Sequence, residues 1–290
     1  MKYLLLLCIS IYLSAIECSN YKVHSLFYQP LTKDAHIQWK KKFRQMNNQN
    51  IDTLILQWSQ YGTYNFLDNK EWLNTILDEA SQHNIKVIIG LYADENYFKT
   101  LKNDTTDIAQ YLNTLKTKNL QQANKIFTQA AKYRSFYAWY IYDEINDLYF
   151  RSKSKQLLLH NYLADLAKGL KKISQKPLYI SSYFSMAMEP NDFAIMLSYL
   201  SSQQYTVLLQ SGVGAQLVNL RESAIYMQAF YKHYDTPFIP IVESFKIVDT
   251  KTLAISQKSR CKQMKMLEKS TKHKSFSIFS MRYFFDDGLR

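Results

Sequence analysis

Two glutamates each follow a short apolar run that has the character of a strand. Glu144 comes after residues Phe136–Tyr142, and Glu243 comes directly after Val242. Cleavage of a glycosidic bond generally requires one carboxylic acid to protonate the leaving oxygen and a second carboxylate to attack the anomeric carbon or to activate water. If both strand ends lie at one edge of the same sheet, this pair predicts glycoside chemistry.

The first of these two strand ends is acidic over several residues. Asp143 directly precedes Glu144, and Asp147 follows. A general acid requires a raised pKa, which burial among aromatic side chains or a neighbouring carboxylate provides. Asp143 and Glu144 are therefore both candidates for the acid, whereas Glu243 stands alone. Each of these carboxylates could instead cap a helix or pair with a basic side chain.

The elements that must position these residues are eight strand-and-helix units. Continuous apolar runs, suited to parallel strands covered on both faces, alternate with segments of helical periodicity. The predicted strands are Val23–Tyr28, Asp52–Leu56, Lys86–Tyr92, Phe136–Tyr142, Leu178–Phe184, Thr206–Leu209, Phe238–Val242 and Phe276–Phe284. Eight such units predict a closed (β/α)₈ TIM barrel, whose active site lies at the C-terminal ends of the strands.

Alternation along the strands groups the candidate acids with their neighbours. Tyr140, Tyr142 and Glu144 share one face of the fourth strand. Ile239, Ile241 and Glu243 share one face of the seventh. Because side chains alternate across a strand, each glutamate points the same way as the residues two and four positions before it. The period is consistent with both glutamates pointing into the barrel mouth.

The end of the chain departs from the usual barrel. Only Phe285 to Arg290 follows the eighth predicted strand, which is too short for a closing helix. The first strand begins almost directly after the N-terminal segment, so no helix there can substitute. We expect the flank between strands eight and one to be bare or covered by a partner, and a second copy in that place would form a dimer.

Aromatic residues near the predicted strand exits are candidates for sugar contacts, because sugar C–H faces stack on aromatic rings. These residues are Trp58, Tyr61, Tyr92, Tyr142, Tyr183 and Tyr283. Most aromatic side chains in any protein belong to the core or the half-buried surface, which is the alternative for each of them.

Other signals for metal, phosphate or nucleophilic serine chemistry are weak. Gly212 and Gly214 follow the sixth strand, whereas phosphate-binding barrels use the loops after strands seven and eight, so a turn of small residues is the better interpretation. The histidines lack metal-ligand spacing, and no G-x-S-x-G motif is present. We expect no metal and no cofactor.

The N-terminus has the pattern of a secretory signal. Lys2 precedes an apolar run over residues 3–13, and small and polar residues follow. We therefore assign residues 1–19 to a signal peptide and residues 20–290 to one barrel domain in a secreted or periplasmic protein. A lipid-modified Cys18 is the rival, disfavoured because Glu17 stands where a small residue is wanted. Later apolar runs are too short for a membrane-spanning helix.

The remaining composition is less specific. Cys18 and Cys261 alone predict no disulfide framework. The formal net charge of +12 comes largely from lysines and arginines in residues 40–44 and 258–274. These could attract an acidic polymer or membrane surface, but solvated outer faces of barrel helices are the better interpretation. Without a nucleic-acid motif, we expect no nucleic-acid partner.

A family resemblance extends across nearly the whole chain after residue 19. It is carried by Gln29-Pro30, Ile51–Trp58, Trp139-Tyr140 leading to Glu144–Asp147, Ser181–Phe184, and Gln210–Gly214. These segments resemble a bacterial TIM-barrel family of uncharacterised function, described as glycoside-hydrolase-like. That family is related to the clan of retaining (β/α)₈ glycoside hydrolases with glutamates on strands four and seven.

The resemblance implies roles for individual residues. Glu144 would be the acid/base and Glu243 the nucleophile, with Gln57, Trp58, Tyr61, Tyr183 and Gln210 lining the sugar site. The clan typically has Asn before its acid/base, where this chain has Asp143, and Trp at the end of strand eight, where this chain has Met281, Arg282 and Tyr283. The contact of that Asn to the sugar 2-hydroxyl would need another donor, either Gln210 or Asn146.

Two functions follow as hypotheses. The first is an exported glycoside hydrolase that acts on a polysaccharide or oligosaccharide, with retention. The second is a non-catalytic carbohydrate-binding or envelope polysaccharide-assembly protein on the same scaffold, because a fold does not fix a function.

Overall fold

A computed structural model describes residues 20–34, 37–202, 204–285 and 287. The predicted signal segment, including Cys18, lies outside the described residues. None of the described helices is long and apolar enough to cross a membrane.

Eight parallel strands close into a single barrel, which confirms the expected (β/α)₈ TIM fold. Around the barrel the order is β1-β13-β10-β9-β8-β7-β5-β2. The strands are β1 (Lys22–Tyr28), β2 (Thr53–Leu56), β5 (Lys86–Gly90), β7 (Phe136–Asn146), β8 (Leu178–Tyr183), β9 (Tyr205–Gln210), β10 (Ile239–Glu243) and β13 (Ser275–Phe279). Their C-terminal ends therefore meet at one mouth, as the predicted site requires.

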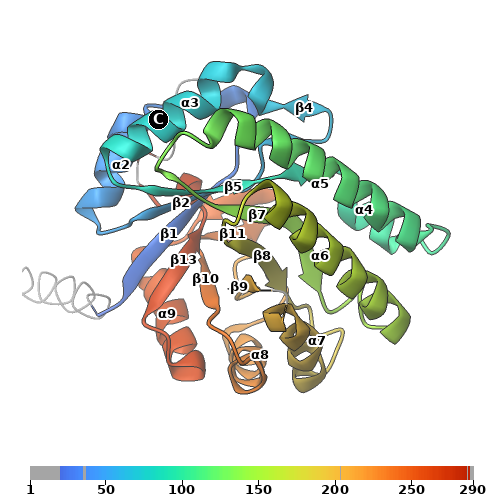
Figure 1. Ribbon diagram of the computed structural model, residues 1–290. Coiled ribbons are helices and arrows are strands. Elements are labelled where there is room, and N and C mark those ends of the chain that lie inside the picture. Colours follow the sequence, from blue (N-terminus) through green and yellow to red (C-terminus); the bar gives the residue numbers. More distant parts are fainter. Residues whose placement is uncertain (1–19, 35–36, 203, 286, 288–290) are drawn as a thin grey trace, which may run out of the picture.

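Helices surround the strands in Figure 1. They are α2 (Trp39–Asn48), α3 (Lys70–Gln82), α4 (Tyr97–Lys102), α5 (Ile108–Ala130), α6 (Lys153–Ile173), α7 (Pro190–Ser202), α8 (Leu220–His233) and α9 (Gln257–Thr271). Short 3₁₀ turns are η1 (Thr32–Asp34), η2 (Phe66–Asp68) and η3 (Met281–Tyr283).

Two small sheets extend the loops at the mouth. One contains β3 (Gln60–Tyr61), β4 (Tyr64–Asn65) and β6 (Tyr92–Ala93). The other is an antiparallel hairpin of β11 (Phe245–Val248) and β12 (Lys251–Ala254), which follows β10 almost directly. The chemistry-bearing end of β10 is thus continuous with a projecting hairpin that the hydrophobic pattern did not indicate.

The core has two layers. Inside the barrel, buried residues from seven of the eight strands pack together; they are Phe27, Ile55, Ile88, Ala138, Tyr140, Tyr179, Leu208 and Ile241. Tyr142 and Ile239 pack against this cluster. A larger apolar layer fills the space between strands and helices. The faces expected to carry Glu144 and Glu243 are therefore interior faces of the barrel.

Several predicted boundaries were wrong. The eighth strand ends at Phe279 rather than Phe284, because the chain turns into η3. The fourth strand instead continues to Asn146, and it contains an irregularity, since Ile141 pairs with Ile180 but Ile145 with Ser182. Four residues of β7 therefore span the same length as two of β8.

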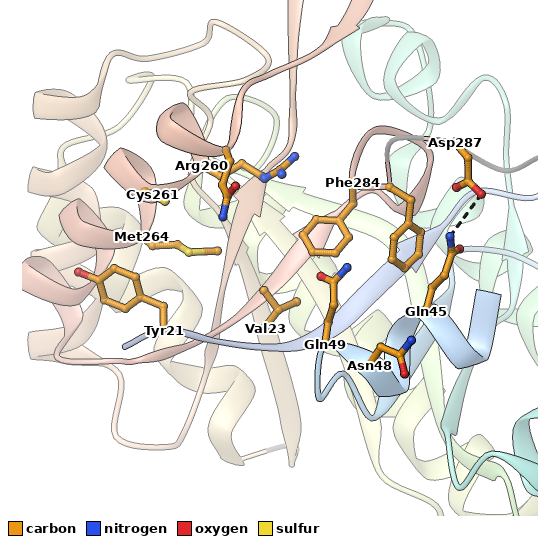
Figure 2. Close-up of a pocket in the computed structure, with 12 residues that line it drawn as sticks. Tyr21, Val23, Gln45, Asn48, Gln49, Arg260, Cys261, Met264, Phe284 and Asp287 are labelled. Carbon is orange, nitrogen blue, oxygen red and sulfur yellow. Dashed lines mark hydrogen bonds between the residues drawn. The ribbon is translucent and has the colours of Figure 1, made fainter. Parts of the chain in front are cut away.

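The flank between β13 and β1 has no closing helix among the described residues, as expected. Instead, a groove of about 660 Å³ lies there, and Figure 2 shows it between Arg260 and Met264 of α9 and Gln45 and Asn48 of α2. Residues after β13 take part of the missing helix's place. Phe284 and Phe285 line the groove, and Asp287 pairs with Lys41 (2.8 Å) and with Lys42 (2.7 Å) of α2.

Candidate active site

Glu144 lies on the inner side of the barrel mouth with part of its surface exposed. Gln210, at the end of β9, donates its Nε2–H to Glu144 Oε1 over 2.7 Å. Burial raises the pKa of Glu144, the bond from Gln210 opposes this shift, and the nearby charge of Glu243 adds a smaller rise, so that the pKa is about 7. A carboxyl with this pKa is about half protonated near neutral pH, which suits a general acid.

Glu243 is more enclosed, with 1% of its surface exposed. Its Oε2 accepts hydrogen bonds from the backbone N–H of Gly214 (2.6 Å) and from Ser211 Oγ (3.2 Å). Burial raises the pKa of the Glu243 carboxyl, and these donors in the loop after β9 oppose that shift because they favour the charged form.

Gln263 of α9 holds the backbone of the same residue. Its Oε1 accepts from Glu243 N (3.1 Å), and its Nε2 donates to Glu243 O (2.9 Å). Ser211 Oγ lies 3.2 Å from Gln263 Oε1 as well as from Glu243 Oε2. Because a hydroxyl has one hydrogen, Ser211 donates to one of these acceptors at a time. Strand β10 is thus fixed from both the loop and the helix.

The two glutamates converge on the end of β9. Gln210 contacts Glu144, and the next residue, Ser211, contacts Glu243. The register agrees, because Ile241 of β10 pairs with Gln210. The structure therefore brings together three of the predicted site residues: Glu144, Glu243 and Gln210.

Asp143 points away from this group, toward α5 and α6. Its Oδ2 accepts from Asn119 Nδ2 (3.0 Å) and from the hydroxyl of Tyr162, and 1% of its surface is exposed. Burial raises the pKa of Asp143 to about 7, as it does for Glu144. Alternation along β7 explains the difference in direction. Of the two adjacent acids, the geometry favours Glu144 as the one that faces a substrate.

Aromatic rings lie beside Glu144. Trp58 contacts Tyr61 (centroids 4.9 Å apart) and Tyr142 (5.5 Å). Burial and then the charge of Glu144 raise the pKa of both Tyr142 and Tyr183, which places these hydroxyls near that carboxyl. Tyr61, Tyr142 and Tyr183 are partly exposed, whereas Trp58 is buried and donates from Nε1 to Pro30 O. The exposed rings are the better candidates for sugar stacking.

Two candidate contacts lie outside this group. Tyr92 is 4% exposed and packs in the outer layer, where Lys118 Nζ donates to its hydroxyl. Asn146 is fully buried, and its Oδ1 accepts from the backbone N–H groups of Leu148 and Tyr149. Asn146 therefore shapes the turn after β7 rather than facing the mouth.

Two further candidates, Gln57 and Tyr283, lie at the edge of the barrel mouth. Gln57 is buried at the end of β2, with its backbone N–H bonded to Tyr28 O. Tyr283 belongs to η3, with its ring centroid 5.9 Å from that of Phe245. Neither side chain has a contact that ties it to Glu144 or Glu243.

Sequence patterns did not indicate the residues that support the glutamates. Tyr97 of α4 donates its hydroxyl to Glu144 O (3.3 Å), and Gln263 brackets Glu243. The one indication of such a role is the position of Gln263, which falls on the buried face of α9 beside Met264. A polar side chain on an apolar helix face requires a hydrogen-bond partner.

The two glycines after β9 confirm the predicted turn. Gly212 has φ +72°, which favours glycine. A Cβ on Gly214 would lie 2.5 Å from Phe245 O and 2.7 Å from Glu243 Cβ. Only glycine brings its backbone N–H this close to the carboxyl of Glu243.

Among the described residues, no group of three or more His, Cys, Asp or Glu side chains could hold a metal ion.

Gly214→Ala should displace the loop from Glu243. The added methyl meets backbone, which cannot move aside cheaply, so we expect a loss of roughly 1–3 kcal/mol in the free energy of unfolding, measured by chemical denaturation. Gly169→Ala in α6 is the matched control, because its Cβ meets only the flexible tip of Leu120. Equal stability of the two variants would contradict this account of Gly214.

Comparisons with known proteins agree with the barrel. The chain is 30% identical over 214 residues to Uncharacterized protein YbcH of Escherichia coli (strain K12), covering 72% of each chain. A "putative alpha-L-fucosidase" from Bacteroides thetaiotaomicron superposes with a TM-score of 0.71 at 18% identity, over 90% of this chain and 88% of that one. A hyperthermophilic endo-beta-1,4-glucanase superposes with a TM-score of 0.55 at 11% identity, over 95% and 93%. Residues 23–284 match the family described as Domain of unknown function (DUF4434), and the chain belongs to that family.

Proposed function

We propose that this protein is an exported glycoside hydrolase that cleaves a polysaccharide or oligosaccharide with retention. The observation that carries the proposal is the convergence of Glu144 and Glu243 on adjacent residues of β9. The raised pKa of Glu144, to about 7, suits the acid of such a pair. The glycoside-hydrolase-like barrel, shared with proteins named as a glucanase and a fucosidase, supports the same reaction class.

In the first step, Glu144 gives its proton to the glycosidic oxygen while a carboxylate oxygen of Glu243 attacks the anomeric carbon, and the bond to the leaving sugar breaks. In the second, Glu144 takes a proton from water, whose oxygen displaces Glu243 from that carbon. Gln210 holds Glu144 in place, and Tyr61, Tyr142 and Tyr183 offer rings to the sugar. Trp58 packs against Tyr61 and Tyr142 and would support these rings, whereas Gln57 is buried at the end of β2.

A second function is favoured by the enclosure of Glu243. Its carboxyl is 1% exposed, and Gly214 and Ser211 already occupy Oε2. To act as a nucleophile, an oxygen of the Glu243 carboxylate must reach the anomeric carbon, and this enclosure restricts its access. A protein that binds carbohydrate, or assists envelope polysaccharide assembly, would keep the aromatic mouth without needing that access.

Replacing each acid separates these functions. Glu144→Gln and Glu243→Gln should each lower hydrolysis by at least about 10²-fold, because each removes a group that reacts. Asp143→Asn is the matched control and should retain most of the activity, since Asp143 faces α5 and α6. The measurement is release of reducing ends from a polysaccharide panel, with thermal unfolding to check folding.

Wild-type turnover in either glutamine variant would refute the assigned roles. No release by the wild type, together with sugar binding that persists in both variants, would select the binding function.

The pH dependence of kcat/KM should be bell-shaped. Glu144 must be protonated, so the rate should fall above about pH 7. Glu243 must be ionised, and because burial raises its pKa, the acidic limb should lie above 4.5. Asp143 also has a pKa of about 7, so the profile must be repeated in Asp143→Asn. If the fall in rate above about pH 7 is lost in that variant, the alkaline limb belongs to Asp143 and not to Glu144.

The proposed export rests on the N-terminal pattern of residues 1–19, in which Lys2 precedes an apolar run and small and polar residues follow.

Intact mass of the full chain expressed in a bacterial host tests export and anchoring. We expect osmotic shock to release a shortened chain without lipid. An uncleaved mass, or a lipid on Cys18 with release by detergent only, would refute this expectation.

Light scattering of the same sample tests the expected dimer over the β13–β1 groove, and a monomer at micromolar concentration would exclude it.

A further inference from the structure

A second groove opens beside the barrel mouth, between α4 and the start of α6. Its volume is about 460 Å³, and Leu101, Leu148 and Tyr149 contribute apolar surface to it. Residues 147–152 follow β7 directly, so this groove lies at the same end of the barrel as Glu144. Leu148 is 44% exposed, so apolar surface is open to a ligand there.

The charges around the groove are mainly positive. Lys102, Arg151 and Lys155 line it, against the single carboxylate of Asp104. Among the salt bridges of the described residues, none involves these three cations. The N-terminus of α6, capped by Ser152, adds the positive end of a helix dipole. The groove therefore presents a net positive charge over an apolar floor.

A row of rings joins this groove to the candidate active site. Tyr149 lines the groove and lies 6.2 Å from Phe98, measured between ring centroids. Phe98 lies 6.0 Å from Tyr183. Tyr183 is close enough to Glu144 for that charge to raise the pKa of its hydroxyl, after the larger effect of burial. A chain of sugars running along these rings would place its further units among the three cations.

We propose that this groove is a subsite for an acidic glycan, and that the substrate carries carboxylate groups several sugars from the cleaved bond. The proposal rests on the proposed function, whose substrate class it specifies. Lys102, Arg151 and Lys155 would pair with the carboxylates, while Tyr149 stacks on a sugar ring. Nucleic acid would satisfy the charge, but the row of rings leads to Glu144 and Gln210, which suit a glycosidic bond.

Affinity electrophoresis tests the subsite without requiring turnover. The wild type is run at 4 °C in gels that contain polygalacturonate, alginate or hyaluronan, and in gels with neutral hydroxyethylcellulose. The test variant is R151E/K155E. The control is K168E/K172E, which reverses the same number of charges at exposed positions near the other end of α6. We expect at least one acidic polymer to retard the wild type, and R151E/K155E to bind it about tenfold more weakly.

The control should bind that polymer within about twofold of the wild type, and 0.5 M salt should remove most of the difference between the variants. The proposal is overturned if no acidic polymer retards the wild type, or if both variants lose affinity equally. Equal retardation by single-stranded DNA, with the same loss in R151E/K155E, would assign the groove to nucleic acid instead.

These outcomes are distinct from failure of the proposed hydrolysis. Acidic-polymer binding without release of reducing ends would leave the subsite standing and remove the enzyme. Hydrolysis of neutral glycans alone, without binding of an acidic polymer, would leave the proposed hydrolysis standing and remove the subsite.

Discussion

The structure around the mouth depends on the burial of one carboxyl group. A charged group removed from water is costly unless hydrogen bonds replace its hydration. Glu243 meets this requirement through Gly214 and Ser211, and Gln263 fixes its backbone from α9. The loop after β9 must therefore be in place before this side chain is satisfied, and α9 must be in place before its backbone is fixed. The same contacts place the end of β9, where Gln210 reaches Glu144.

Two adjacent acids of β7 have nearly equal pKa values but different surroundings. Asp143 is held between Asn119 and Tyr162 behind the barrel wall, whereas Glu144 contacts Gln210 inside it. Burial is the main cause of the raised pKa in both, so the pKa alone does not identify the catalytic group. The direction of each side chain distinguishes the two acids, since Glu144, the proposed acid, points inward and Asp143 does not.

The repeating apolar runs were sufficient to predict the barrel. Period-two alternation determined which residues of β7 and β10 share a face, but not which face points inward. Three features could not be read in this way. The irregularity at residues 141–145 depends on pairing with β8, and the hairpin after Glu243 has mostly exposed residues. Helix α4 and the first half of α5 occupy a segment whose Asn and Lys content hid its helical pattern. Supporting residues such as Gln263 are determined by tertiary contacts, which leave little trace in local pattern.

The enclosure of Glu243 also limits what the fold can imply. Barrels with the same architecture host many functions, so likeness to hydrolases at 18% identity or below establishes the scaffold and not the reaction. The deciding quantity is the access of a sugar to Glu243. Ser211 already has two competing acceptors, so it can turn from Glu243 to Gln263 without losing a hydrogen bond. That exchange would leave the backbone N–H of Gly214 bonded to Oε2. The side chain of Ser211 could thus release the carboxylate without movement of the loop backbone.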